Sequence, residues 1–412
     1  MTHVPFYRPD LGEPEIDEVI ASLKSGWLTT GPRVKRFEEE FAQAVSAPHA
    51  VAMNSCTAAL HLAIEALGVR PGDGVLVPTL TFAATAEVVR YQGGIPILVD
   101  CDATTLNLDL HHAEQLLTRI AAGDTVAGLP RIERIVGIIP VHVAGMMMDI
   151  GAIQSFAARH NLWVVDDAAH AFPAAWRPGP DQPWQQCGQQ TAAVSCFSFY
   201  ANKTITTGEG GMAVTADRTL ADRMRLMSLH GLSHDSWGRY AGKGSWDYRI
   251  LAPGYKYNMT DIAAAIGIHQ LARAETMRRD RELIATQYLV ALRDVEEIEL
   301  PLIDDNRIHA WHLFPIRLHP RKSKIDRNAF IRELNDAGVA CSVHWRPLHL
   351  HPYYEQTFAW KPQDLPVASE LWTRLVSLPL FSSMKSEEVD AVVTVVRTLL
   401  GRSAARSAVH VG

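Results

Sequence analysis

The sequence lacks any cysteine pair spaced as a zinc ligand motif. Its five cysteines are dispersed at positions 56, 101, 187, 196 and 341, and no Cys-x-x-Cys motif occurs. An odd and scattered set of cysteines indicates free thiols in a reducing compartment. We therefore expect a cytoplasmic protein without a metal site.

Long apolar runs and an excess of positive charge are also lacking. No stretch approaches the roughly 20 apolar residues of a membrane span, and residues 1–5 lack the basic and apolar regions of a signal peptide. The net charge is -6, whereas nucleic-acid-binding proteins normally carry a basic face. We expect neither a membrane nor a nucleic acid as partner, although a local cluster could still bind an anionic substrate.

The chain of 412 residues is long for one core, so two subdomains are expected. Ile16, Val19, Ile20 and Leu23 have helical spacing, and residues 57–67 are rich in Ala and Leu. The β-branched content and the lack of alternation fit a mostly parallel α/β sheet covered on both faces. Its strands are predicted at 74–77, 95–99, 135–139, 162–165, 193–197 and 212–214.

The character of the chain changes after about residue 275. A charged helix is predicted over 274–293, strands over 313–318 and 340–343, a helix between Asp326 and Gly338, and a last helix from Ser386. We therefore predict an N-terminal arm and large domain at 1–275 and a smaller α+β domain at 276–400. The small and polar tail 401–412 is expected to be disordered.

Lys203 is the most informative residue. It follows the predicted strand 193–197 and precedes Gly-Glu-Gly-Gly at 208–211, while Asp166 and Asp167 follow the strand 162–165. Open α/β sheets place ligands at such strand ends. An amine and a carboxylate in one crevice suit pyridoxal phosphate, which has a carbonyl at one end and a basic ring nitrogen at the other. The ordinary alternatives are a surface lysine and a helix-capping aspartate.

Only one of the two aspartates should face a cofactor, because strand alternation points consecutive side chains to opposite faces. Ser55, Cys56 and Thr57 open the Ala-rich helix. Backbone amides at a helix N-terminus, with a threonine hydroxyl, form a natural phosphate cradle. An ordinary helix cap would use the same residues.

Several blocks, in order along residues 5–400, resemble the sugar aminotransferases of the DegT/DnrJ/EryC1/StrS family. The resemblance implies a fold-type I pyridoxal phosphate enzyme with a large domain and a smaller C-terminal domain. The matching blocks are 26–32 (GWLTTGP), 54–60 (NSCTAAL), 78–85 (PTLTFAAT), 140–145 (PVHVAG), 166–170 (DDAAH), 198–203 (SFYANK), 254–259 (GYKYNM) and 343–349 (VHWRPLH).

The resemblance also implies roles for single residues. Lys203 corresponds to the Schiff-base lysine that later shuttles a proton, and Asp167 rather than Asp166 corresponds to the partner of the pyridinium nitrogen. The further cofactor contacts implied are Cys56 and Thr57 on the phosphate, Ser198 as a second phosphate ligand, Phe82 stacked on the ring, His170 near the 3-hydroxyl, and Asn258 or Lys256 reaching the phosphate of a partner subunit.

The activity implied is amino transfer from L-glutamate, which leaves as 2-oxoglutarate, to a nucleotide-linked keto sugar. Residues 230–232 and 254–258 look most like enzymes that aminate C4 of UDP-linked 4-keto sugars. Thr29, Thr30, His344, Trp345 and Arg346 are the candidates for the nucleotide-sugar side. Since the segment around Asn258 reaches a neighbouring subunit in relatives, a homodimer with shared active sites is expected.

Two other functions remain open at this stage. A sugar dehydratase of the same family uses pyridoxamine phosphate but carries histidine in place of the lysine, and Lys203 argues against it. A non-catalytic regulator that binds the cofactor would be expected to lose Lys203 or Asp167, or to carry a DNA-binding domain, and none of these features is seen.

Overall fold

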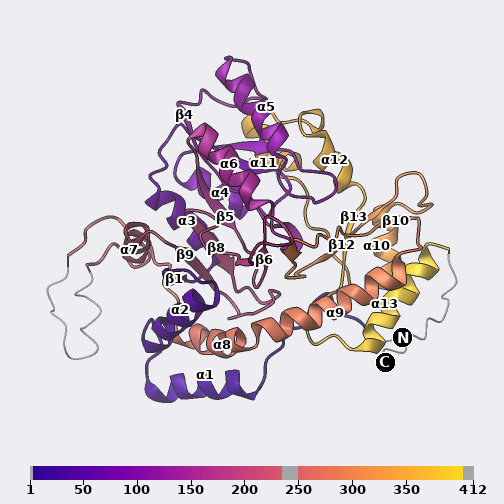
Figure 1. Cartoon of the computed structure of the whole chain (residues 1–412), viewed down its shortest axis with the longest axis horizontal. Coiled ribbons are helices and arrows are strands. Elements are labelled where there is room, and N and C mark those ends of the chain that lie inside the picture. Colours follow the sequence, from indigo (N-terminus) through magenta and orange to yellow (C-terminus); the bar gives the residue numbers. More distant parts are fainter. Residues whose placement is uncertain (1–2, 234–248, 402–412) are drawn as a thin grey trace.

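The computed structural model describes residues 3–233 and 249–401, so the predicted tail lies, except for Gly401, outside the described residues. A seven-stranded sheet with the order β1-β9-β8-β5-β4-β2-β3 forms the centre of the larger part (Figure 1). Its strands are β1 (His49–Met53), β2 (Asp73–Pro78), β3 (Ile95–Val99), β4 (Arg134–Ile138), β5 (Trp163–Asp167), β8 (Val194–Ser198) and β9 (Gly211–Thr215).

The sheet is mixed but mostly parallel, as predicted. Strands β2, β3, β4, β5 and β8 pair in parallel, whereas β9 runs antiparallel to both β8 and β1. The strands expected from the apolar runs are present. Strand β1 is an addition that its alanine-rich sequence did not indicate, because alanine carries little preference for strands.

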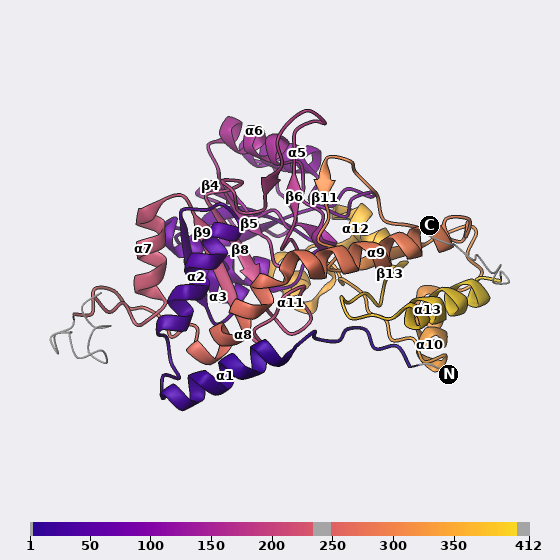
Figure 2. The same ribbon diagram turned by 60° about the horizontal axis from the view of Figure 1, so that its bottom comes forward.

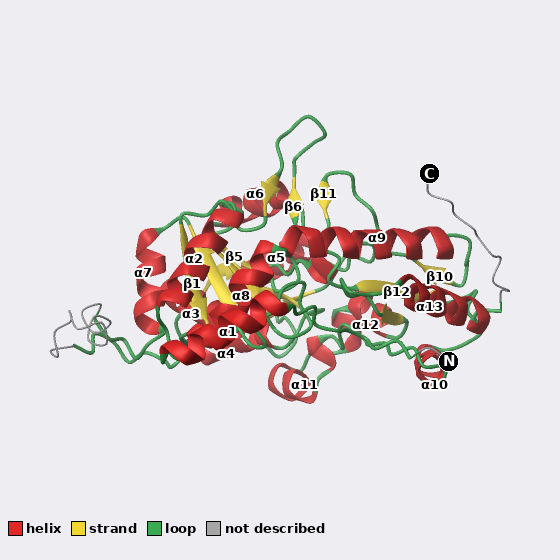
Figure 3. Cartoon of the chain, turned by 90° about the horizontal axis from the view of Figure 1, so that it is seen from below, coloured by secondary structure: helices red, strands yellow, loops and turns green. Residues whose placement is uncertain are grey.

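Helices connect successive strands of this sheet and pack against it (Figure 3). Helix α3 packs against β8 and β9, and α2 packs against β1. The helices of this part are α2 (Pro32–Ala44), α3 (Cys56–Ala66), α4 (Ala84–Tyr91), α5 (Leu110–Ala121), α6 (Ile150–His160), α7 (Arg218–Met227) and α8 (Asp261–Ala272), with a 3-10 turn at η1 (Val143–Gly145).

Helix α1 (Glu13–Ser25) forms as the spacing predicted, but its apolar stripe does not join the core. Ile16, Ile20 and Leu23 are 48%, 40% and 53% exposed, while Glu15 and Ser22 are buried against the rest of the chain. The Glu15 carboxylate accepts hydrogen bonds from Gln270 and Arg273, beside α8. A polar network, rather than the apolar stripe, therefore sets the orientation of this helix.

A second buried cluster forms around β12 (Phe314–Leu318) and the long helix α9 (Ala274–Leu292). Figure 2 shows the N-terminal segment beside this part, and Val4 joins its core. The predicted strand 340–343 does not form, since only Ser342 pairs, with Ser377 of β13. The remaining elements here are β10 (Ile298–Glu299), α10 (Arg327–Asp336), β13 (Leu375–Leu378) and α13 (Ser386–Leu399).

Short elements connect the two parts. A small sheet pairs β11 with β6 and β6 with β7, and residues 348–365 return to pack on the core of the large sheet. These connecting elements are β6 (Ala175–Trp176), β7 (Gln185–Gln186), β11 (Arg307–Ile308), η3 (Leu348–Leu350), α11 (Pro352–Phe358), η4 (Pro362–Asp364) and α12 (Pro366–Trp372). Within residues 3–233 and 249–401, no helix combines the length and the apolar content needed to cross a membrane.

Candidate active site

A cavity of about 570 Å³ lies at the carboxyl ends of β5 and β8. These two strands are parallel neighbours, with Asp167 opposite Cys196, so the residues that follow them meet at one edge of the sheet. The N-terminus of α3 and residues 342–345 complete the wall. Of the residues singled out from the sequence, those that line the cavity are Cys56, Thr57, Phe82, Asp167, His170, Ser198, Lys203, His344 and Trp345.

The two consecutive aspartates point to opposite faces of the sheet. Asp167 lines the cavity and accepts a hydrogen bond from the Thr85 hydroxyl at 2.8 Å and another from the Ala169 amide at 3.2 Å. Asp166 is fully buried behind the sheet, where its Oδ2 accepts from the hydroxyls of Thr191 and Ser195. Burial raises the pKa of Asp167, although its hydrogen bonds and the charge of Lys203 oppose this shift.

Lys203 extends its amine into the same cavity. Burial lowers the pKa of Lys203 to about 8, because an apolar environment disfavours the ammonium form. Its Nζ lies 3.3 Å from Nε2 of His312, whose own pKa is lowered well below its ordinary value by burial. This shift increases the fraction of the lysine that is neutral near physiological pH, which is the form that attacks a carbonyl carbon.

The N-terminus of α3 opens toward the cavity. The Ser55 hydroxyl caps the helix by accepting from the Ala58 amide at 3.1 Å, which leaves the amides of Cys56 and Thr57 as the free donors of the first turn. The Cys56 thiol donates to the Cys196 carbonyl, so the backbone amide of Cys56, rather than its sulfur, is available to an anion. A Cβ at Gly211 would overlap the backbone of Ser55 and Cys56.

Two side chains in the cavity wall have groups that nothing in the described chain covers or hydrogen-bonds. Phe82 is 62% exposed, which is unusual for a phenylalanine and leaves its ring face free to stack on a planar ligand. His170 is buried, and its Nδ1 has no hydrogen-bond partner among the described residues. Burial lowers the pKa of His170 well below its ordinary value, so the ring is neutral.

The outer wall comes from residues 342–345. The His344 ring is held by Ser377 at 2.9 Å and stacks on Phe6, and Trp345 stacks on His170 at 5.0 Å between ring centroids. Burial lowers the pKa of His344 to about 3. Arg346 does not line the cavity: its side chain is exposed and donates to the Leu350 carbonyl.

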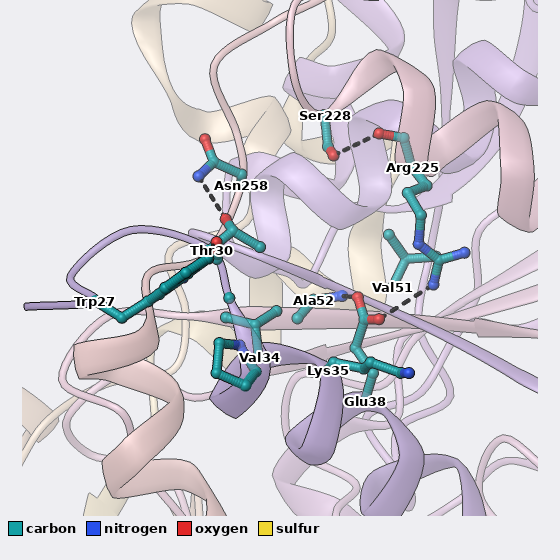
Figure 4. Close-up of a pocket in the computed structure, with 12 residues that line it drawn as sticks. Trp27, Thr30, Val34, Lys35, Glu38, Val51, Ala52, Arg225, Ser228 and Asn258 are labelled. Atoms are coloured by element: carbon teal, nitrogen blue, oxygen red, sulfur yellow. Dashed lines mark hydrogen bonds and ion pairs between the residues drawn. The ribbon is translucent and has the colours of Figure 1, made fainter. Parts of the chain in front are cut away.

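Thr29, Thr30 and Asn258 also lie away from this cavity. Thr30 and Asn258 border a second pocket of about 310 Å³, where the Asn258 amide donates to the Thr30 hydroxyl at 2.7 Å (Figure 4). Lys256 donates to the Asn258 side chain at 2.6 Å. Within one chain, these residues therefore form a group separate from Lys203 and Asp167.

Several residues in the cavity wall or directly behind it received no role from the sequence alone. His312 and Thr85 contact the two central groups directly, and Tyr200, Asn202 and Glu209 line the wall. All of these except His312 lie within or beside blocks already singled out, which was a usable signal. His312 had only its position just before a predicted strand, more than 100 residues from Lys203.

The cavity fits pyridoxal phosphate. A buried carboxylate without a cationic partner is costly, and a pyridinium nitrogen at Asp167 would neutralise it. Free helix amides at Cys56 and Thr57 suit a phosphate, the exposed Phe82 ring suits a planar ring, and the unpartnered His170 nitrogen suits a hydroxyl. In the described part of the chain, no group of three His, Cys, Asp or Glu side chains could hold a metal ion.

Comparison with known proteins agrees with this geometry. The chain is 42% identical over 398 residues to the spore coat polysaccharide biosynthesis protein SpsC of Bacillus subtilis (strain 168), covering 96% of this chain and 97% of that protein. Spr1654 of Streptococcus pneumoniae, assigned as a sugar aminotransferase and solved in a PLP form and a PMP form, is 30% identical, with a TM-score of 0.84 in both forms. The PLP-form alignment covers 97% of this chain and 99% of that chain.

The aminotransferase TlmJ of Streptoalloteichus hindustanus is 29% identical with a TM-score of 0.82, covering 96% of this chain and 98% of that chain. The model of the DegT/DnrJ/EryC1/StrS aminotransferase family matches residues 9–397. The cofactor of this family is pyridoxal phosphate, and the fold of the chain agrees with that of the solved relatives. The chain is a member of the DegT/DnrJ/EryC1/StrS family of sugar aminotransferases.

Proposed function

We propose that this chain transfers the amino group of L-glutamate to C4 of a nucleotide-linked 4-keto sugar. The observation that carries this proposal is the shared cavity of Lys203 and Asp167, whose outer wall contains His344 and Trp345. Bound pyridoxal phosphate supplies a carbonyl that takes up the amine and a ring that accepts electrons. A cavity of about 570 Å³ is within the range of small-ligand sites.

The residues of this chain have separable tasks in that reaction. Asp167 holds a proton on the ring nitrogen of the cofactor, because a buried carboxylate favours a paired positive charge. Lys203, in its neutral form, would hold the cofactor at its carbonyl carbon, and its free amine would carry the proton that leaves the Cα of glutamate to the cofactor. The amides of Cys56 and Thr57, with Ser198, hold the phosphate in place while the Phe82 ring covers the ring face.

The substrate side of the proposal rests on the outer wall. His344 and Trp345 line the cavity from the segment 342–345 rather than from the ends of the strands. Their aromatic rings suit the flat faces of a sugar or a base. The likeness of residues 254–258 to enzymes that aminate UDP-linked 4-keto sugars supports C4 and the nucleotide. Product mass after incubation with glutamate and a panel of UDP-, dTDP- and GDP-linked keto sugars tests this. The Lys203→Ala variant serves as the blank. If none of the keto sugars in the panel gave an amino sugar product, the proposal would be overturned.

We also propose that the functional unit is a homodimer. Asn258 and Thr30 lie away from their own chain's cavity, and α1 exposes Ile16, Ile20 and Leu23 together, which fits a surface covered by a second copy. Mixing Lys203→Ala with an inactive Asn258→Ala variant should restore part of the activity through hybrid dimers. A fully active monomer in sedimentation would contradict the proposal.

A further inference from the structure

Arg281 is a buried cation whose charge is not balanced. It lies on α9 at 2% exposure, and its guanidinium donates to the carbonyls of Trp311 and Leu380 and to the Ser382 hydroxyl, at 3.1–3.2 Å. In the part of the chain that the structure describes, no carboxylate forms an ion pair with it. Arg278, one turn earlier on the same helix, is also buried but pairs with Glu275 and Glu282.

Of the carbonyls that Arg281 binds, that of Trp311 belongs to the loop that carries His312. Trp311 has a φ of 48°, a conformation that residues other than glycine rarely adopt. The guanidinium bonds at Trp311, with a longer one to the His312 carbonyl at 3.5 Å, hold the backbone in this conformation. The His312 ring then lies 3.3 Å from the Lys203 amine. The amine and the arginine are thus connected through one short loop.

The amine of Lys203 also lies in the field of that arginine. Burial is the main reason that the pKa of Lys203 falls to about 8; Cys56 and Asp167 oppose the shift, and Arg281 adds to it. Burial lowers the pKa of Arg281 to about 10, so the guanidinium stays charged at neutral pH. The titratable and charged groups that face the amine are Cys56 of α3, Asp167 of β5, Arg281 of α9, and His170, His312 and His344 of loops.

We propose that Arg281 is a positioning residue that fixes His312 against the Lys203 amine, and that its unbalanced charge favours the neutral, reactive form of this amine. Placing a carboxylate beside the guanidinium would cancel the effect, because a nearby ion pair presents little net charge at a distance. The inference rests on the proposed role of Lys203 in the aminotransfer reaction. It adds a residue of the smaller part of the chain, outside the cavity wall, that prepares the amine.

The test is the pH dependence with which Lys203 reacts with an acetylating reagent in the full-length, cofactor-free chain, resolved by mass spectrometry. Arg281→Met removes the charge. Ser382→Asp neutralises the charge in place, because the Ser382 hydroxyl that it replaces lies 3.1 Å from Nε of Arg281. Both should move the midpoint to higher pH. Labelling at neutral pH should then fall about threefold to tenfold, since one pKa unit is a factor of ten in neutral amine.

Matched controls separate charge from packing. Arg278→Met removes a buried arginine that is already neutralised, and Ser382→Asn keeps the shape of the aspartate without its charge. Neither should move the midpoint. An unchanged pH profile of Lys203 acetylation in Ser382→Asp, or an equal shift of the midpoint in Ser382→Asn, would overturn the proposal. The comparison of these two variants tests the proposal even if Arg281→Met does not fold. Because no sugar is involved, failure of every keto sugar in the panel would leave this outcome unaffected.

Discussion

The cavity at Lys203 and the second pocket at Asn258 balance their charges differently. In the cavity, Asp167, Lys203 and the histidines are wholly or partly buried without fixed ion pairs, and burial moves their pKa values toward those of neutral forms. In the second pocket, Glu38 accepts from Arg225 and from the Ala52 amide, which ties α2 to β1 and α7 (Figure 4). A ligand could complete the unbalanced groups of the cavity, whereas the balanced pair in the second pocket holds the fold.

The largest expected effect is loss of Lys203. Lys203→Ala should abolish turnover, and borohydride should no longer attach the cofactor to the chain, because the nucleophilic amine is gone. Lys35 of the second pocket is the matched control, since Lys35→Ala removes an exposed amine and should leave turnover near that of the unmodified chain. Steady-state rates and peptide mass after reduction measure both. Full turnover in Lys203→Ala would remove the distinction between the two pockets.

The aspartate pair gives the next largest effect. Asp167→Asn should raise the activation barrier by about 2–4 kcal/mol, because a charge-assisted hydrogen bond to a buried cation is lost. Asp166→Asn should affect turnover less and thermal unfolding more, since Asp166 binds Thr191 and Ser195 behind the sheet. Turnover and melting temperature of the two variants separate these roles. The reverse ranking in turnover would transfer the cofactor contact to Asp166.

A smaller effect is expected at Gly211, where β9 approaches α3. Gly211→Ala places a Cβ against the backbone of Ser55 and Cys56, so the first turn of α3 must shift and the cofactor should bind more weakly. Overpacking of this kind costs about 1–3 kcal/mol. Titration of the cofactor-free chain with pyridoxal phosphate gives the affinity. Gly151→Ala in α6, where an added Cβ makes only ordinary van der Waals contacts, is the control, and an equal loss there would show a general effect on stability.

The smallest effects should distinguish the residues of the outer wall. His344→Ala removes a ring that lines the cavity and should slow the keto-sugar half-reaction by about tenfold, near 1.4 kcal/mol, while sparing the glutamate half-reaction. Arg346→Ala, whose side chain bonds Leu350 outside the cavity, should change either half by less than about 0.5 kcal/mol. Single-turnover spectra resolve the halves. Equal damage to both halves in His344→Ala would place that residue nearer the cofactor.

Local patterns were sufficient for much of the fold. Apolar runs predicted the parallel strands, and Asp326 predicted the start of α10, where its side chain accepts the capping bonds. Neighbouring positions in the sheet then bring Asp167 and Lys203 together, because parallel strands end at the same edge. These features depend on residues close in sequence or on one topological rule.

What the sequence determined by itself was the family, the central lysine and the presence of one aspartate beside it. Only the tertiary structure decided that His312 reaches the amine, that Arg346 points away and that α1 buries Glu15 instead of Ile16. Each of these depends on the direction of a side chain relative to an element far away in the chain. Such directions follow from packing between elements, which no local pattern of residues specifies.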